Sequence, residues 1–327
     1  MATSPSRPTE PDAPIVHEEL PDDLHLAAPV GPPPYTGWIL VPLLVIAVAG
    51  LVLWIPYESE RDKVAPESLA RRSRLAFLAP GTTAWIRHAT GDAEITDSSL
   101  ARLTAHDDVE SLDLSGTSVT DAGLVHLLGY DRLNWISLRN TRVSDAGLVH
   151  LARLPRLKGL DLENTRVTGH SLPMLKTIHS LNLSGTPVDD QGLARVGQFE
   201  ALNDLSLART AVTDRGMLHL RSLPFLHVLS LSGTTITSTG IINLGHHKHL
   251  WILHLDWTLV GDAAMAHLAN HPVLMEVSLE GTQVSDTGVS DLARLQQIRC
   301  LSLKHVPVTQ QSLRLLQGAH PDAIILR

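Results

Sequence analysis

A threonine recurs at a nearly constant spacing through most of this 327-residue chain. Seven successive intervals are 24, 24, 21, 24, 24, 24 and 24 residues. A fixed period of this length is typical of solenoids, in which each repeat packs only against its neighbours. The period therefore favours an extended binding surface over a catalytic pocket as the functional part of the molecule. The threonines are Thr117, Thr141, Thr165, Thr186, Thr210, Thr234, Thr258 and Thr282.

Each repeat carries two apolar patterns. If this threonine is numbered position 9, the first repeat begins at Val109 and the ninth at Ile298. Positions 4 and 6 are apolar and alternate with polar residues, which predicts a strand with one buried face. Position 11 is Val or Ile, and positions 16 and 19 are apolar and three residues apart, which predicts a short helix. Each repeat should therefore fold as strand, turn, short helix and return loop.

Three further positions carry small or polar residues. The position-9 hydroxyl can bond the backbone of the turn, and stacked repeats would align these hydroxyls in a ladder. Position 12 is usually Ser or Thr, often followed by Asp. This pair predicts a helix N-cap beside a negative charge that suits the positive end of the helix. Position 15 is usually Gly, a poor helix former, which predicts close backbone packing.

The repeat LxxLxLxxTxVTDxGLxxLxxLxx resembles that of leucine-rich repeat proteins, in the variant found in many bacterial repeat proteins. It is also similar to the cysteine-containing repeats of F-box substrate receptors, with Thr where those often carry Cys or Asn. The resemblance covers about residues 85–327. It implies an α/β fold: a right-handed horseshoe with a parallel sheet on its concave face and short helices on its convex face. It does not imply one activity, because such repeats serve many binding roles.

The array departs from the pattern at its ends and once in the middle. Residues 85–108 keep the phase, but His88 and Thr90 replace apolar strand residues, which predicts a degenerate cap. Residues 323–326 are predicted to form a closing strand. The third repeat, from Leu157 to Thr177, is three residues shorter than the others. We expect the loss in its return segment, with a local change of curvature.

Residues 38–57 predict a membrane-spanning helix. The run is apolar and uncharged, and a helix of this length reaches about 30 Å, the thickness of the hydrocarbon core. Tyr35, Trp38, Trp54 and Tyr57 lie near its ends, as interfacial aromatic residues do. A buried core helix is one alternative, but a solenoid buries its own core. A signal peptide is another, but no basic region precedes the run and no small-residue cleavage site follows it.

The segments on either side of this run predict its topology. Residues 1–37 are rich in proline and acidic residues and should form a disordered tail. Residues 58–84 should form a juxtamembrane linker with a capping helix over 66–79, and a basic helix lying on anionic lipid is the alternative. Lys and Arg near the run lie only on its C-terminal side. The positive-inside rule then predicts a single-pass protein of the cell membrane with its repeats in the cytoplasm.

Composition argues against several classes of function. The net charge of −8 leaves no strong basic field, so nucleic acid is not an expected partner. The sequence has no nucleotide-binding glycine loop, paired metal-type cysteines or nucleophile elbow, so we expect neither a cofactor nor an enzyme. The single cysteine, Cys300, excludes an internal disulfide. Cys300 and His305 could form a catalytic pair, but no third group orients them, and both are better explained as surface residues.

The histidines raise a metal-binding alternative. His246, His247 and His249 crowd one return loop. His247 and His271 both occupy position 22, where stacking would place them about 5 Å apart across neighbouring strands. Imidazole suits zinc, copper or nickel. Position 22 is elsewhere apolar or aromatic, so we expect His247 and His271 to pack partly buried, and we predict no metal site.

Positions 3, 5 and 7 should form the concave face, where we expect a protein ligand to bind. Most of these residues are small and polar, which lets a ligand approach the sheet. Exposed Trp and Arg are enriched in binding hot spots. The alternative is that Trp135 and Trp257 merely cover sheet edges or turns. The first predicted group is Trp135 with Arg139. The second group, flanked by Trp251, consists of Ile252, His254, Asp256 and Trp257 with the adjacent Val228. The predicted site also includes Asp161, Glu163 and Glu280.

The sequence therefore predicts a membrane-anchored, non-enzymatic scaffold that binds another protein on its concave face. The resemblance to F-box receptors suggests one alternative, an adaptor or substrate receptor of a ubiquitin-ligase-type complex, although no F-box-like helical domain precedes the repeats. A metal-binding repeat protein that uses the cluster between His246 and His271 is the other alternative.

Overall fold

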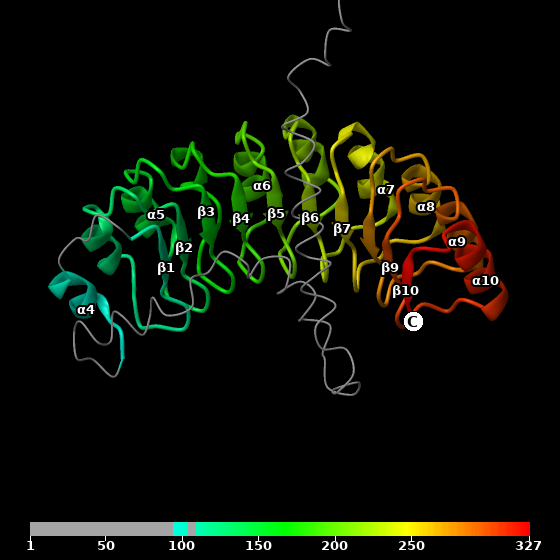
Figure 1. The fold of residues 1–327 in the computed structure, drawn as a ribbon. Coiled ribbons are helices and arrows are strands. Elements are labelled where there is room, and N and C mark those ends of the chain that lie inside the picture. The colour runs from blue at the N-terminus through cyan, green and yellow to red at the C-terminus, as the bar shows by residue number, and fades with distance from the viewer. Residues whose placement is uncertain (1–93, 104–108) are drawn as a thin grey trace, which may run out of the picture. The chain divides into compact units, whose positions relative to one another are not determined.

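Ten parallel strands form one sheet in the part of the chain that the structure describes, residues 94–103 and 109–327 of a computed structural model. The strands follow one another in sheet order from β1 to β10, and a short helical segment lies between successive strands (Figure 1). The predicted repeat of strand and helix is confirmed. The strands are β1 (Ser111–Asp113), β2 (Trp135–Ser137), β3 (Gly159–Asp161), β4 (Ser180–Asn182), β5 (Asp204–Ser206), β6 (Val228–Ser230), β7 (Ile252–His254), β8 (Glu276–Ser278), β9 (Cys300–Ser302) and β10 (Ile324–Leu326).

The helical segments lie along the outer side of the curved sheet (Figure 1). Some are α-helices and others are 3-10 helices. The α-helices are α4 (Asp97–Arg102), α5 (Asp145–Leu151), α6 (Asp190–Val196), α7 (Ser238–Ile241), α8 (Asp262–Leu268), α9 (Asp286–Leu292) and α10 (Gln310–Ala319). The 3-10 helices are η2 (Gly123–Leu127), η3 (Leu172–Met174), η4 (Gly216–Ser222) and η5 (Ile242–His246).

Residues at the same repeat position pair along the whole sheet. Even across the short third repeat, Gly159 of β3 pairs with Ser180 of β4, so the missing residues lie outside the strand. The helical segment of this repeat, η3, has only three residues. Leu175 follows it and is buried. The deletion therefore shortens the helical segment as well as the return loop, which corrects the prediction that only the return segment is affected.

The core is one continuous stack of apolar side chains from Ile95 to Leu316. The residues at positions 4, 6, 11, 16 and 19 of the repeats are buried. Burial of a leucine-sized side chain stabilises the fold by about 1.5–3 kcal/mol. Ile95 and Leu100 belong to the stack, and the rest of the predicted degenerate cap, including His88 and Thr90, lies outside the described residues. The closing strand is confirmed as β10, which pairs with β9.

The predicted membrane span at 38–57 lies outside the described residues, as do the tail and the capping helix. Among the helices that the structure describes, none is both long and apolar enough to cross a bilayer.

The position-9 hydroxyls bond within their own repeats. Thr258 Oγ1, for example, donates to the Leu255 carbonyl at 2.6 Å. The predicted bond to the turn backbone is therefore confirmed. Each hydroxyl proton is used in this bond, so the threonines of neighbouring repeats do not form a chain of hydroxyl-to-hydroxyl bonds.

Aspartate at position 13, where a repeat carries it, ties that repeat to the next. The Asp262 carboxylate accepts hydrogen bonds from the Ser285 backbone N–H at 2.7 Å and from the Ser285 hydroxyl at 2.6 Å. The same hydroxyl accepts the Thr287 N–H at 3.3 Å, which confirms Ser285 as the N-cap of α9. The prediction assigned these aspartates to their own helix ends, but the bonds run between repeats. Both bonds recur for Asp97, Asp121, Asp145, Asp190 and Asp214.

Glycine at position 15 leaves room for this aspartate. A Cβ atom on Gly288 would lie 2.5 Å from Asp262 Oδ1. Where Ser238 replaces the aspartate, the next repeat carries Ala264 in place of glycine. The predicted close packing at position 15 is confirmed, and its partner is the carboxylate of the preceding repeat.

Candidate binding face

Glu163 lies at the centre of the first predicted group. Its carboxylate is 3.3 Å from Arg139 Nη1 and 3.0 Å from Arg209 Nη2. Asn182 Nδ2 donates to Asp161 Oδ1 at 2.7 Å and lies 3.4 Å from the Glu163 carboxylate. Ion pairs at this partial exposure contribute at most about 1 kcal/mol each, so their main effect is to hold the side chains in place. The structure thus brings together Arg139, Asp161 and Glu163 and adds Arg209 and Asn182, which the sequence analysis missed.

Trp135 lies flat over the sheet rather than projecting from it. A Cβ atom on Gly159, its partner on β3, would lie 1.9 Å from Trp135 Cε3. Trp135 Nε1 and the hydroxyl of Ser111, its partner on β1, are buried without a hydrogen-bond partner among the described residues. Trp135 therefore covers its neighbouring strands, rather than a sheet edge or a turn. A glycine one repeat after a tryptophan is the sequence signal for this packing.

The second predicted group begins with an apolar pair. Val228 and Ile252 are partners on β6 and β7, and both are half-buried. On the next pair of strands, His254 Nε2 lies 3.0 Å from Glu276 Oε1. Trp251 stacks on His227 with ring centroids 4.5 Å apart and an interplanar angle of 6°. Trp251, which was predicted to flank this group, therefore forms an aromatic stack with His227.

Asp256, Trp257 and Glu280 form the other end of this group. The Asp256 carboxylate accepts the Glu280 backbone N–H at 2.9 Å and the hydroxyls of Ser232 and Ser278. Trp257 is 60% exposed, whereas Glu280 is only 6% exposed. The structure therefore leaves the indole of Trp257 largely exposed, in the repeat that carries Asp256 and one repeat before Glu280.

A row at position 8 borders the concave face, and the sequence analysis missed it apart from Trp257. Every member has a φ between 55° and 70°, in the left-handed region where glycine is least strained. The Trp257 N–H donates to the Glu280 carbonyl at 2.6 Å, which fixes the row against the next repeat. The row is Gly116, Asn140, Asn164, Gly185, Arg209, Gly233, Trp257, Gly281 and His305.

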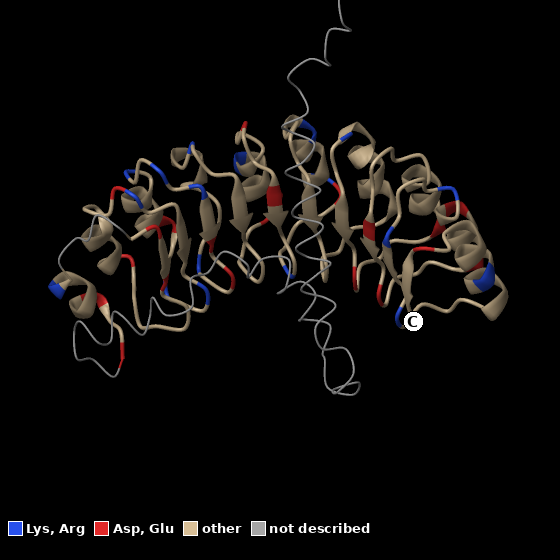
Figure 2. Ribbon diagram, in the orientation of Figure 1, with Lys and Arg blue, Asp and Glu red and all other residues tan. Residues whose placement is uncertain are grey.

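Acidic residues outnumber basic residues on the concave positions 3, 5 and 7. Figure 2 shows acidic residues, coloured red, on the strands and near the strand ends. A face of this charge attracts cationic groups and repels anionic groups. The acidic residues are Asp113, Asp161, Glu163, Asp204, Asp256, Glu276 and Glu280, and the basic residues are Arg139 and Lys304.

Comparison with known proteins agrees with this architecture. A family model described as a leucine-rich repeat matches residues 222–245. No curated protein matches the chain. Among solved structures, internalin C2 of Listeria monocytogenes is 24% identical with a TM-score of 0.51, over 70% of this chain and 92% of that chain. The described region is a leucine-rich repeat solenoid.

Two longer solved structures have the same fold. A leucine-rich repeat protein of Leptospira interrogans is 21% identical with a TM-score of 0.52, over 70% of this chain and 56% of that chain. TLR13, solved in a complex with ssRNA13, is 21% identical with a TM-score of 0.52, over 67% of this chain and 36% of that chain. This chain spans less than two thirds of either one. At these identities the likeness shows the fold of the solenoid alone.

The two position-22 histidines are part of the packed interior of the solenoid. His247 is 2% exposed and His271 is 6% exposed. Burial lowers the pKa of both, and backbone carbonyls of Leu223 and His247 oppose this only in part. His247 Nε2 and both ring nitrogens of His271 lack a partner with hydrogen-bond geometry among the described residues. Within residues 94–103 and 109–327, no three His, Cys, Asp or Glu side chains are arranged to hold a metal ion.

Cys300 has the character of a structural thiol. Burial, with a smaller contribution from the charge of Glu276, raises its pKa to about 11. The thiol is therefore protonated at neutral pH, whereas nucleophilic cysteines need a depressed pKa.

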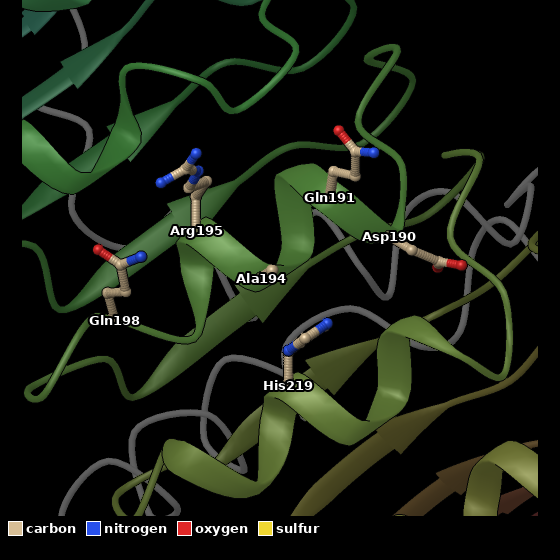
Figure 3. A pocket seen from close by; sticks show the side chains of 6 residues that line it. All are labelled: Asp190, Gln191, Ala194, Arg195, Gln198 and His219. Carbon is tan, nitrogen blue, oxygen red and sulfur yellow. The ribbon is translucent and has the colours of Figure 1, made fainter.

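A shallow depression lies on the convex side of the solenoid, between α6 and η4. It encloses about 340 Å³ (Figure 3). The Asp190 carboxylate at its rim bonds the Thr213 N–H at 2.8 Å and the Thr213 hydroxyl at 2.7 Å, so it is committed to the contact between repeats. The depression offers no converging set of reactive groups. It is lined by Asp190, Gln191, Ala194, Arg195, Gln198 and His219.

Proposed function

We propose that this protein is a membrane-anchored, non-enzymatic scaffold that binds a protein ligand on its concave face. Leucine-rich repeat folds are typical of protein-binding scaffolds. The observation that carries the proposal is the concave face itself, where small polar residues leave the sheet open and two groups of larger residues interrupt them. The projecting Trp257 and the paired charges around Glu163 are the features that hot spots commonly use.

A protein ligand fits this face better than a nucleic acid. TLR13 was solved with ssRNA13, and its solenoid has the same fold as this one. The concave positions here carry more carboxylates than basic groups, however, and a phosphate backbone needs basic partners.

Proximity labelling in cells tests the ligand-binding part of the proposal. The full chain would carry a biotin ligase, and the Arg139→Ala and Trp257→Ala variants would be compared with it. Loss of a hot spot of about 2 kcal/mol weakens binding about thirty-fold, so concave variants should lose the same labelled proteins. The control is Leu218→Ala/His219→Ala on η4, which should keep them. Identical labelling by all variants would contradict a concave binding site.

Fractionation tests the anchor and its orientation. The full chain should resist alkaline extraction from membranes, and a variant lacking residues 38–57 should become extractable. Protease added to intact cells should leave the repeats uncut if they face the cytoplasm. An extractable full chain would refute the anchor, and cleavage of the repeats in intact cells would refute the orientation.

A further inference from the structure

Trp257 occupies a place where the fold favours glycine. Its φ is 56°, and the neighbouring residues in the row are Gly233 and Gly281. A bulky residue in this left-handed region costs about 1–3 kcal/mol, so Trp257 does not stabilise the backbone at this position. The indole lies over Gly281, where a Cβ atom would be 2.5 Å from Trp257 Cε3. Because 60% of Trp257 stays exposed, the result is an open aromatic surface.

A buried carboxylate lies beside this indole. Glu280 is 94% buried, and no described residue donates a hydrogen bond to its carboxylate. Its one ion-pair partner among the described residues is His305, whose Nε2 lies 3.7 Å from Glu280 Oε1, beyond hydrogen-bond distance. The His305 ring is also 5.8 Å from the Trp257 ring, so one histidine lies close to both the carboxylate and the indole.

Two further charges lie in the same row of position-7 residues. Asp256 precedes Glu280, and the donors that fill its oxygens are neutral groups, so its negative charge adds to that of Glu280. Lys304 follows Glu280 and forms no ion pair with a described residue. A buried carboxylate with incomplete partners binds a cation more strongly than an exposed one, because water screens it less.

The chain itself shows which cation suits such a carboxylate. Glu163 occupies position 7 of its repeat, as Glu280 does. Arg209 Nη2 lies 3.0 Å from Glu163 Oε1, and Arg139 fills the preceding position-7 place. At Glu280 the preceding place holds Asp256 instead of an arginine. The second site therefore has the same acceptor but lacks the guanidinium that the first site carries.

We propose that Trp257, Glu280 and Asp256 form a receptor for an arginine side chain of the protein ligand. This inference rests on the protein-binding function proposed above and specifies its partner. The guanidinium stacks on the exposed face of Trp257 and donates to the Glu280 carboxylate, while Asp256 adds attraction at longer range. Arginine is preferred over lysine, because only its planar group both stacks on an aromatic ring and donates in a fork.

Fluorine NMR of the full chain labelled with 5-fluorotryptophan tests the proposal. The Trp257→Phe variant assigns the Trp257 signal. The probe is the blocked peptide acetyl-Gly-Arg-Gly-amide, compared with its lysine and citrulline forms. The Trp257 signal should shift saturably with the arginine peptide, at least about five-fold more weakly with lysine, and not with citrulline, which keeps the shape but lacks the charge.

Two variants separate charge from stacking. Glu280→Gln should weaken arginine binding about ten-fold, because a hydrogen bond to a charged group is lost. Glu200→Gln, an equal charge change at an exposed loop, should leave binding unchanged. Trp257→Gly introduces the residue found in the flanking repeats, so the variant should fold. Because it lacks the Trp257 signal, its binding is followed by saturation transfer from the protein to the protons of the arginine peptide, which should be abolished. Unmoved signals of the other tryptophans verify folding of Glu280→Gln.

Equal shifts with arginine and citrulline peptides, or full affinity of Glu280→Gln, would overturn the inference. Proximity labelling in cells then distinguishes failure of the arginine site from failure of the broader protein-binding proposal. If ligands are lost from Arg139→Ala but persist in Trp257→Gly and Glu280→Gln, the concave face binds protein and the arginine site is wrong. If no concave variant changes labelling, both proposals fail.

Discussion

The contact between Asp262 and Gly288 predicts that these two positions are energetically coupled. In Gly288→Ala the new Cβ would lie 2.5 Å from Asp262 Oδ1, 2.9 Å from Met265 Cγ and 3.0 Å from Val284 Cγ1. Overpacking of this kind costs about 1–3 kcal/mol. Alanine regains about 0.5–1 kcal/mol over glycine in a helix. We therefore expect Gly288→Ala to lower the free energy of unfolding by about 1–2 kcal/mol.

Replacement of Asp262 should reduce the cost of Gly288→Ala. Asp262→Ser removes the two bonds to Ser285 and costs about 1–3 kcal/mol by itself. The double variant reproduces the native pair of Ser238 and Ala264, in which Ser238 Oγ accepts the Gly261 N–H at 3.0 Å. The double variant should therefore lose about 1–2 kcal/mol less than the sum of the two single changes.

Urea unfolding of the full chain, followed by far-ultraviolet circular dichroism, measures the four free energies of this cycle. Hydrogen exchange of the α9 amides checks that the change is local. The matched control pairs Asp262→Ser with Gly318→Ala, because a Cβ on Gly318 meets no atom within 4 Å. The control should be additive. Additivity within about 0.5 kcal/mol in the test cycle as well would refute the coupling.

Three further predictions concern other places in the solenoid. Gly159→Ala should displace the Trp135 indole and increase acrylamide quenching of tryptophan fluorescence. The control Gly245→Ala, whose new Cβ meets no atom within 4 Å, should leave the quenching unchanged. Unchanged quenching in both variants would contradict the covering position of Trp135. The rate of alkylation of Cys300, measured by mass spectrometry, should keep rising with pH to about 11. Glu276→Gln should move this pH dependence to lower pH, because the carboxylate charge contributes to the raised pKa. A midpoint of the rate profile near the usual pKa of a thiol would contradict the prediction. Because the pKa of both His247 and His271 is lowered in the fold, the unfolded chain binds protons first as pH falls below about 6.5, and stability declines from that point. His247→Leu/His271→Leu should reduce the fall in Tm between pH 7.5 and pH 5, and an equal fall in both proteins would show that other groups cause it.

The sequence predicted the architecture well because the same constraint acts in every repeat. A strand with apolar positions 4 and 6 can bury them only against the matching strands on either side, so the pattern specifies both strand and register. The return of Leu160 and Leu181 to one row, despite the shorter third repeat, shows how strongly this constraint acts. Contacts between repeats were harder to predict, because the partners lie a whole repeat apart. The bonds of Asp262 to Ser285 are an example.

The type of helix could not be predicted from local sequence. Residues 121–127 and 145–151 have the same sequence, DAGLVHL. The first copy contains the 3-10 helix η2, whereas the second forms the α-helix α5. Local propensity is identical in the two copies, so the surrounding structure decides between the two hydrogen-bond patterns.

The candidate site was partly predictable for a related reason. Trp257 and Glu280 depart from the consensus, so the sequence alone identified them as unusual. Their burial depends on the direction in which their side chains lean over the next repeat, and only the structure shows that Trp257 covers Gly281 and that Trp135 covers Gly159. Sequence analysis therefore treated two tryptophans as equivalent, although Trp257 stays largely exposed and Trp135 has a buried ring nitrogen.

The two ends of the concave face differ in what a ligand must displace. At Glu163 the chain already supplies two guanidinium groups, so a ligand there must break ion pairs before it forms its own. At Glu280 the carboxylate has no donor within hydrogen-bond distance among the described residues, and the adjacent indole is open. A new charge-assisted bond at Glu280 therefore adds to binding without the loss of an existing one. This asymmetry is the physical reason to expect that ligand specificity is determined at the C-terminal half of the face, while the N-terminal half mainly holds the surface in shape.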